Sequence, residues 1–210
     1  MLISTSYTSV YAEATLFLSN IDADWAQLIS TVGTCTLAEE TETNLSPYQA
    51  LVQAVAYQQL HTKAGDAIFT RFLSHFSGFA TPEQLIAASF DDLRACGFSA
   101  RKIEAIQGIA QATLNGLVPT RAKAEILSNE AIIESLITLR GIGQWTVEMM
   151  LIFSFNRMDI LPVNDFAVVA GYTRLKNLSI APKPKQLAEI GKAWSPYRTI
   201  ASWYLWRVPK

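Results

Sequence analysis

The chain has 210 residues, half of them hydrophobic and 17% charged, with 18 acidic against 17 basic side chains. No stretch approaches the roughly 18 consecutive apolar residues of a membrane span, and the N-terminus lacks the basic, then apolar, pattern of a signal peptide. The two cysteines, Cys35 and Cys96, are too few for a disulfide framework, a paired-cysteine metal site or a four-cysteine iron–sulfur cluster. We therefore expect a cytoplasmic globular protein of one or two domains, with no membrane partner.

The near-zero net charge hides an uneven distribution along the chain. Residues 1–62 carry a net charge of −6, residues 63–139 of −1, and residues 140–210 of +6. A basic C-terminal third inside a slightly acidic protein is typical of a surface that faces a polyanion. Ordinary solvated faces that happen to segregate along the chain give the same pattern, and the composition leaves both interpretations open.

Capping residues and helix breakers divide the chain into short helical units. Only residues 1–10 have an extended pattern, and no segment alternates long enough to form a sheet. The sequence therefore predicts an all-α protein. The predicted helices, in chain order, are 48–60 after Ser46-Pro47, 62–76, one opened by Thr81-Pro82, one opened by Ser89, 100–114 after Ser99, 130–139 after Ser128 or Asn129, 144–155, 165–175 capped by Asn164, and a last one from Ser195-Pro196 to residue 207.

The most informative segment, residues 136–146, reads LITLRGIGQWT and lies between two predicted helices. Two glycines that flank one apolar residue allow a tight reversal of the backbone. Such a turn leaves N–H groups at the start of the next helix available for a phosphate oxygen, and the candidate donors are Gly141, Gly143, Gln144 and Thr146. Taken alone, the glycine pair more often indicates helix packing or a helix C-cap.

A second signal is Asp165, within the segment Pro162–Phe166 at the start of a predicted helix. The helix dipole favours a carboxylate there, so that Asp165 alone is explained as a cap. The third signal is aromatic, because four of the five tryptophans lie at or after Trp145. Tryptophans in such a run are more often core residues than parts of a binding site.

Taken together, these pieces resemble the helix–hairpin–helix (HhH-GPD) DNA glycosylase superfamily, and most closely its 3-methyladenine DNA glycosylase II branch in a compact form without an extra N-terminal β domain. In that branch, a hairpin of the form L-x-G-I-G-x-W-T-A precedes an essential aspartate by some two dozen residues. Here LRGIGQWTV ends at Val147, and Asp165 lies 24 residues after Gly141. Residues 22–37, 54–64 and 194–206 are also similar to the family. The chain departs from the usual pattern at Arg140, where the family has proline, and at Met149, where its better-known bacterial form has tyrosine.

The resemblance implies one glycosylase unit over residues 1–210, made of two helical subdomains with the active-site cleft between them. Residues 1–45 and the C-terminal helices are expected to form one subdomain. Residues 46–160, with the hairpin at 136–146, are expected to form the other.

The resemblance also implies a DNA repair enzyme that flips and excises alkylated purines, methylated at N3 or N7 and cationic, by hydrolysing the N-glycosidic bond to leave an abasic site. Asp165 is then the catalytic residue, which stabilises the positive sugar and aligns water. Trp145, Trp206 and Met149 form the base-binding pocket. Leu60 or His61 is the wedge that fills the gap left in the DNA.

Relatives that also cut the strand carry a lysine where Trp145 stands, so the resemblance implies a monofunctional enzyme without lyase activity. No cofactor is required for catalysis, although the backbone carbonyls of Ile137, Leu139 and Ile142 match positions at which relatives hold a structural Na⁺ or K⁺ ion. The expected partner is double-stranded DNA that contains alkylated bases. The protein is expected to act as a monomer, and to associate with the nucleoid if its source is bacterial.

The basic residues near these motifs are candidates for phosphate contacts that position the DNA without reading its sequence. They include Lys176, Lys183, Lys185 and Arg198. Two other functions stay open at this point. One is a helix–hairpin–helix module that binds DNA without catalysis. The other is a glycosylase for oxidised or mismatched bases, which the absence of the lysine and of a cysteine cluster disfavours.

Overall fold

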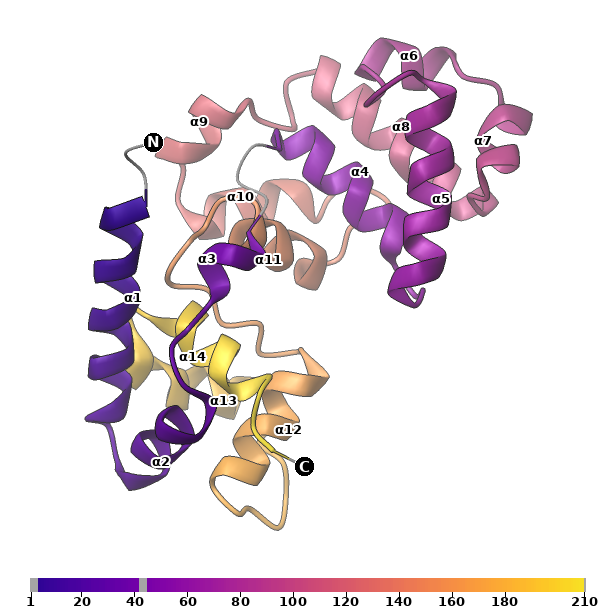
Figure 1. The fold of residues 1–210 in the computed structure, drawn as a ribbon. Coiled ribbons are helices and arrows are strands. Elements are labelled where there is room, and N and C mark those ends of the chain that lie inside the picture. The colour runs from indigo at the N-terminus through magenta and orange to yellow at the C-terminus, as the bar shows by residue number, and fades with distance from the viewer. Residues whose placement is uncertain (1–3, 42–44, 210) are drawn as a thin grey trace. The chain divides into compact units, whose positions relative to one another are not determined.

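The computed structural model describes residues 4–41 and 45–209, and every regular element in this part of the chain is helical (Figure 1). The all-α prediction is therefore confirmed. None of the described helices is long and apolar enough to cross a membrane. The helices are α1 (Ser4–Ser19), α2 (Ala23–Val32), α3 (Leu37–Glu40), α4 (Pro47–Tyr57), α5 (Thr62–His75), α6 (Pro82–Ala87), α7 (Phe90–Cys96), α8 (Ala100–Leu114), α9 (Arg121–Ile126), α10 (Asn129–Leu136), α11 (Gln144–Phe153), α12 (Phe166–Leu175), α13 (Pro184–Ile190) and α14 (Arg198–Leu205), with a 3₁₀ turn η1 (Gly191–Trp194).

The chain divides into two compact units. Unit 1 combines residues 1–41 with residues 151–210, and unit 2 is the continuous segment 42–150. The second boundary falls within α11, ten residues before the position near 160 that the sequence suggested. The segment 151–160 therefore belongs to unit 1, together with the loop that leads to Asp165.

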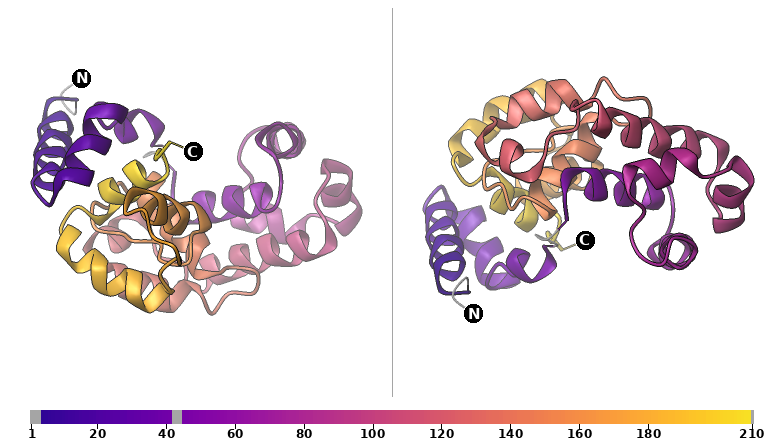
Figure 2. Two further views of the ribbon diagram at one scale, coloured as in Figure 1. Left: turned by 90° about the horizontal axis from the view of Figure 1, so that it is seen from below. Right: turned by 90° about the horizontal axis from the view of Figure 1, so that it is seen from above.

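Unit 2 is built around α8, against which α4 and α6 pack, while α5 packs against α4 and α7 (Figure 2). The faces that meet are apolar at helical spacing, as shown by the fully buried Leu51 and Val55 on α4 and Ile106 and Ile109 on α8. Phe72 of α5 is also fully buried. Its ring contacts those of four further phenylalanines, Phe69, Phe76, Phe79 and Phe98, at centroid distances of 5.1 to 5.9 Å.

The helices of unit 2 that were predicted from the caps Ser46, Thr81, Ser89, Ser99 and Ser128 begin at those caps, whereas α9, capped by Thr120, was not predicted. Ser46 and Thr81 form capping boxes with Gln49 and Gln84, each box using both a side chain and a backbone N–H group. Ser89, Ser99, Thr120 and Ser128 each accept a hydrogen bond from a backbone N–H group in the first turn of the helix that follows. Local side-chain chemistry therefore sets the start of each of these helices.

Unit 1 has its core where α12 packs on α14 and where α1 and α2 meet the C-terminal helices. Gly171 allows the close approach of α12 to α14, because a Cβ atom at this position would lie 2.0 Å from the carbonyl oxygen of Leu205. Trp25 and Trp194 are fully buried and pack edge to face with their ring centroids 5.4 Å apart. These tryptophans are core residues.

The element predicted at the N-terminus differs from the structure. The extended pattern over residues 1–10 was wrong from Ser4 onward, because α1 starts there, and residues 1–3 lie outside the described residues. The buried residues Tyr11, Ala14 and Leu18 follow helical spacing and give α1 its packed face. The packing of this face, and not the extended pattern of the first residues, decides the structure of the segment from Ser4 onward.

Two predicted caps were also wrong. Asp165, not Asn164, caps α12, and its Oδ1 accepts the N–H of Val168 at 2.8 Å. Ser195 does not start α14, which begins at Arg198, because the Ser195 hydroxyl donates to the carboxylate of Asp159 at 2.9 Å instead.

Candidate active site and nucleic-acid interface

Asp165 is held at the N-terminus of α12 by two hydrogen-bond donors that meet the same carboxylate oxygen. Its Oδ1 accepts the backbone N–H of Val168 at 2.8 Å and the indole Nε1–H of Trp206 at 3.0 Å. The cap and the catalytic interpretation of Asp165 are therefore compatible, since a helix cap fixes the carboxylate in place. The side chain is half-buried.

Trp206, at the end of α14, is oriented by more than its bond to Asp165. Its ring lies nearly parallel to that of Phe153, with centroids 6.0 Å apart and an angle of 17° between the planes. The sequence suggested Trp206 as a stacking residue for a base but gave no sign of its hydrogen bond. Phe153 was missed, although its position four residues after Met149 in α11 was a usable signal.

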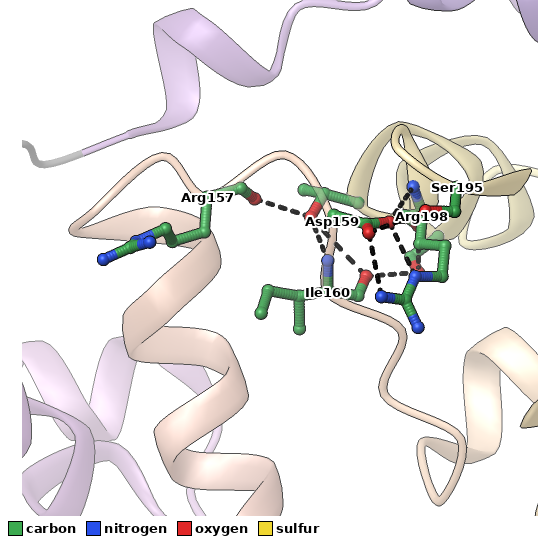
Figure 3. A network of polar contacts seen from close by, with 7 residues as sticks. Arg157, Asp159, Ile160, Ser195 and Arg198 are labelled. Carbon is green, nitrogen blue, oxygen red and sulfur yellow. Dashed lines mark hydrogen bonds and ion pairs between the residues drawn. The ribbon is translucent and has the colours of Figure 1, made fainter. Parts of the chain in front are cut away.

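The loop that leads to Asp165 is anchored to α14 by a network around Asp159 (Figure 3). The guanidinium of Arg198 binds both carboxylate oxygens of Asp159, with Nε 2.6 Å from Oδ1 and Nη2 2.8 Å from Oδ2. The backbone N–H of Arg198 also donates to Asp159 at 3.3 Å. The hydroxyl of Thr199 accepts the N–H of Ile160 at 2.9 Å. A carboxylate from the loop therefore satisfies the first turn of α14.

This network also sets the ionisation of Asp159. Burial alone would raise the pKa of its carboxyl group. The hydrogen bonds from Arg198 and Ser195, together with the positive charge of Arg198, outweigh burial and hold the pKa of Asp159 below its ordinary value. The loop is thus fixed by a carboxylate that stays charged.

In unit 2, the hairpin after α10 has the geometry that the two glycines suggested. Gly141 has φ of +82°, and a Cβ atom there would lie 3.0 Å from the Cβ of Ala105 on α8. Ile142, between the glycines, is buried. Within the described residues, the N–H groups of Gly141, Gly143 and Gln144 donate no hydrogen bond. These three groups stay candidate phosphate donors at the start of α11.

Thr146 is placed differently from the other three candidates of the hairpin. Its N–H donates to the carbonyl of Gly143 at 3.0 Å, and its side chain is buried. Its Oγ1 accepts a hydrogen bond from the amide of Gln58. Thr146 therefore supports the hairpin from inside, and we leave it out of the phosphate contacts.

The three carbonyls suggested for a monovalent cation are suitable donors. The carbonyl of Leu139 accepts the N–H of Ile142 at 3.1 Å, which leaves it a second lone pair. The carbonyls of Ile137 and Ile142 accept no N–H from any described residue. Backbone carbonyl oxygens are ligands that suit Na⁺ and K⁺. The described residues contain no cluster of three or more histidine, cysteine, aspartate or glutamate side chains that could hold a metal ion.

The two candidate wedge residues lie on the short link between α4 and α5. The side chain of Leu60 is 38% exposed, and that of His61 is exposed and makes no capping bond to α5. Gln59, beside them, has φ of +57°, which is uncommon for a residue other than glycine. The link therefore presents its side chains outward from unit 2.

The remaining predicted residues divide by exposure and by charge pairing. Trp145, in the first turn of α11, is 46% exposed, and Met149 is half-buried. Lys176 binds the carboxylates of Asp22 and Asp24 at 2.6 and 2.7 Å. Arg198 is paired with Asp159 in the same way, so both cations form ion pairs within unit 1. Lys183 and Lys185 are exposed.

Comparisons with known proteins identify the family of the chain. Residues 52–196 match the model of the HhH-GPD superfamily base excision DNA repair protein. The chain is 45% identical over 200 residues to DNA-3-methyladenine glycosylase 1 of Schizosaccharomyces pombe, which covers 94% of this chain and 87% of the relative. The solved structure of S. pombe 3-methyladenine DNA glycosylase Mag1 with abasic DNA superposes with a TM-score of 0.83 at 45% identity, covering 93% of this chain and 95% of that one. A DNA-3-methyladenine glycosidase from Bacillus halodurans gives a TM-score of 0.81 at 34% identity, with 92% and 88% covered. The chain belongs to the HhH-GPD superfamily of base excision DNA repair proteins.

Proposed function

We propose that this protein is a DNA glycosylase that extrudes alkylated purines from duplex DNA and hydrolyses their N-glycosidic bond, leaving an abasic site. The observation that carries the proposal is the Asp165 carboxylate, which two donors fix at the start of α12. The similarity to S. pombe DNA-3-methyladenine glycosylase 1, and to Mag1 in complex with abasic DNA, supports both the substrate class and the product.

The chemistry follows from the charge of the substrate. A purine methylated at N3 or N7 is cationic, so it leaves with the electron pair of the glycosidic bond and needs little acid catalysis. The sugar then carries positive charge at C1′, and the carboxylate of Asp165 stabilises this charge. Asp165 also orients a water molecule, whose oxygen bonds to C1′ while its proton passes to the carboxylate or to solvent.

The aromatic residues would select the base. The exposed ring of Trp145 attracts a cationic purine by about 0.5–2 kcal/mol, depending on how far the pair is shielded from water. Met149, one helical turn further on in α11, contributes a polarizable wall. Trp206 belongs to unit 1, where its indole N–H positions Asp165.

The DNA would be held mainly by backbone groups. The N–H groups of Gly141, Gly143 and Gln144 meet phosphate oxygens, and the carbonyls of Ile137, Leu139 and Ile142 hold a monovalent cation that steadies the turn. Leu60 or His61 enters the gap that the extruded base leaves. The enzyme acts as a monomer. It lacks lyase activity, because the hairpin carries Trp145 at the position where a lysine would be needed.

The test is to incubate methylated genomic DNA with the purified protein and to identify the released bases by chromatography. Asp165→Asn is the test variant, and Asp91→Asn, an exposed aspartate on α7, is the matched control. We expect release of methylpurines by the wild type and by Asp91→Asn, none by Asp165→Asn, and strand breaks only after alkali. No release by the wild type while it still binds DNA would instead establish a binding module without catalysis.

A further inference from the structure

The link between α4 and α5 is a tight turn with an unusual residue at its third position. The N–H of Leu60 donates to the carbonyl of Tyr57 at 3.2 Å, and Gln58 has φ of −50° and ψ of 131°. Together with the φ of +57° at Gln59, these angles describe a type II turn, in which glycine is the usual residue at the position of Gln59. Because Gln59, Leu60 and His61 are exposed, their side chains do not anchor the turn in the core, and another contact must fix it.

The side chain of Gln58 provides that hold by reaching the hairpin. Its Nε2 donates to the carbonyl of Gly141 at 3.2 Å and lies 3.3 Å from Oγ1 of Thr146, to which it also donates. A side-chain amide carries two N–H donors, so both bonds form at once. One partner is in the turn of the hairpin and the other is buried in the first turn of α11. A single amide thus joins the turn at residues 57–60, called the wedge turn below, to the turn of the hairpin and to the start of α11.

Helix α8 contacts both the end of α4 and the turn of the hairpin. The ammonium group of Lys102 donates to the carbonyl of Ala56, the second-last residue of α4, at 2.8 Å. Ala105, three residues further along α8, is the residue that a Cβ at Gly141 would touch. The end of α4 and the turn of the hairpin therefore rest on the same stretch of one helix.

We propose that Gln58 is a positioning residue that locks the wedge turn to the hairpin, so that the two act on DNA as one rigid element. The proposal rests on the function proposed above, in which the hairpin holds a phosphate and Leu60 or His61 enters the base stack. Extruding a base from a duplex costs free energy. A wedge can displace a base only if the turn that carries it does not move when it meets the base stack. The hairpin, held on the DNA backbone, is the fixed point, and Gln58 joins the turn to it.

The test compares variants that differ only in these hydrogen bonds. Gln58→Met keeps the length of the side chain and removes both donors, whereas Thr146→Val keeps the shape of Thr146 and removes one acceptor. Gln53→Met, on the same helix α4, is the matched control, because the side chain of Gln53 makes no hydrogen bond within the described residues. Thermal unfolding of each variant reports on the fold, and Thr146→Val carries the test if Gln58→Met does not fold.

Two synthetic duplexes separate positioning of the wedge from a general loss of activity. One carries a single 7-methylguanine opposite cytosine, and the other carries it opposite an abasic-site analogue, where the base is already unpaired. Under single-turnover conditions with saturating protein, we expect Gln58→Met to slow release from the paired duplex about tenfold, Thr146→Val about threefold, and Gln53→Met less than twofold. On the unpaired duplex, we expect all three variants to lie within about twofold of the wild type, since extrusion costs less there.

Equal slowing of Gln58→Met on both duplexes, or equal slowing by Gln53→Met, would overturn the inference and leave the proposed function standing. An unslowed Gln58→Met would overturn it as well. If the wild type released 7-methylguanine from neither duplex and no methylpurine from methylated genomic DNA, the proposed glycosylase function would be overturned, and the positioning role with it.

Discussion

Each of the two units has an apolar core, and the units differ in the polar contacts that support it. Unit 2 is one continuous segment, and its helices are started by local caps at positions such as Ser46, Thr81 and Ser99. The ion pairs of its described residues, Arg121 with Glu125 and Arg140 with Glu104, are largely exposed and are expected to contribute little.

Unit 1, by contrast, is assembled from two segments that lie more than 100 residues apart in the sequence. Ion pairs join these segments: Lys176 binds Asp22 and Asp24, and Arg207 binds Glu40 at 2.7 Å. A segment that closes a long loop must be tied by contacts of its own, because no neighbouring turn holds it. Unit 1 adds ion pairs to its apolar core for this purpose.

The comparison explains the uneven charge of the sequence. The acidic N-terminal segment and the basic C-terminal segment fold into the same unit, which holds eight acids against nine bases. Much of the basic C-terminal third is therefore neutralised inside unit 1. The hairpin of unit 2 offers backbone N–H groups instead, and in the function proposed above these groups, rather than net charge, hold a phosphate.

The largest effect on stability is expected at the contact of α12 with α14. In Gly171→Ala, the new Cβ would meet the Leu205 carbonyl, which is backbone and cannot move away, so we expect a loss of about 3 kcal/mol in the free energy of unfolding. Gly108→Ala is the control, because Gly108 lies within α8 of unit 2 and faces open space. There the greater helix propensity of alanine should stabilise by up to about 1 kcal/mol. Urea unfolding measures both, and an unchanged stability of Gly171→Ala would contradict the close approach.

The next largest effect concerns activity, at Trp206 in unit 1. Trp206→Phe keeps an aromatic ring beside Phe153 but removes the N–H that Asp165 accepts. A hydrogen bond to a charged group contributes roughly 1.5–3 kcal/mol, so we expect single-turnover excision to fall about 10- to 100-fold. The loss should be the same for a cationic methylpurine and for neutral hypoxanthine. A loss confined to the cationic base would show that Trp206 acts by stacking on the base and not through Asp165.

A smaller effect is expected at Asp159, and it depends on pH. Asp159→Asn should lower the free energy of unfolding by about 1–2 kcal/mol at neutral pH, because the charge-assisted bonds to Arg198 are lost. The pKa of Asp159 is lowered in the native state, so its contribution is present above the ordinary aspartate value of 3.8 and disappears as the pH falls below it. The difference between wild type and variant should therefore shrink in acid. A difference that stays constant between pH 7 and pH 2.5 would contradict the role of this charge.

The smallest effect is expected for a local cap in unit 2. Ser99→Ala removes the side chain that accepts the N–H of Lys102 at 3.3 Å, and we expect a loss of about 1 kcal/mol. Because the serine does not titrate, this loss should be the same at pH 7 and at pH 3. If the loss caused by Ser99→Ala also became smaller in acid, as is expected for Asp159→Asn, the proposed difference between the helix caps of unit 2 and the ion pairs of unit 1 would be contradicted.

The sequence was sufficient for the parts of the fold that local chemistry decides. Serine and threonine caps such as Ser46 and Ser99 predicted most helix starts of unit 2, although α9 was missed, and the glycine pair predicted the turn at Gly141. It failed where a distant residue took over a local role. Ser195 appeared to be a helix cap, but Asp159, 36 residues earlier, uses its hydroxyl and supplies the first turn of α14 instead.

The same limit applies to the candidate site. The residue types and the spacing from the hairpin to Asp165 could be read directly from the chain. The bonds of Asp165 to Trp206 and of Gln58 to Gly141 join residues 41 and 83 positions apart, and no periodicity or cap signals such pairs. These contacts depend on how the helices pack, which a single sequence does not specify.

The most direct test of the central claim, that Asp165 performs the chemistry and Trp206 positions it, is a double-mutant cycle on single-turnover release of 7-methylguanine. We expect Trp206→Phe to slow the wild type at least tenfold and to have no further effect in an Asp165→Asn background, because the indole N–H then has no catalytic carboxylate to position. If the two substitutions instead multiplied their separate losses, Trp206 would act independently of Asp165 and the claim would be contradicted.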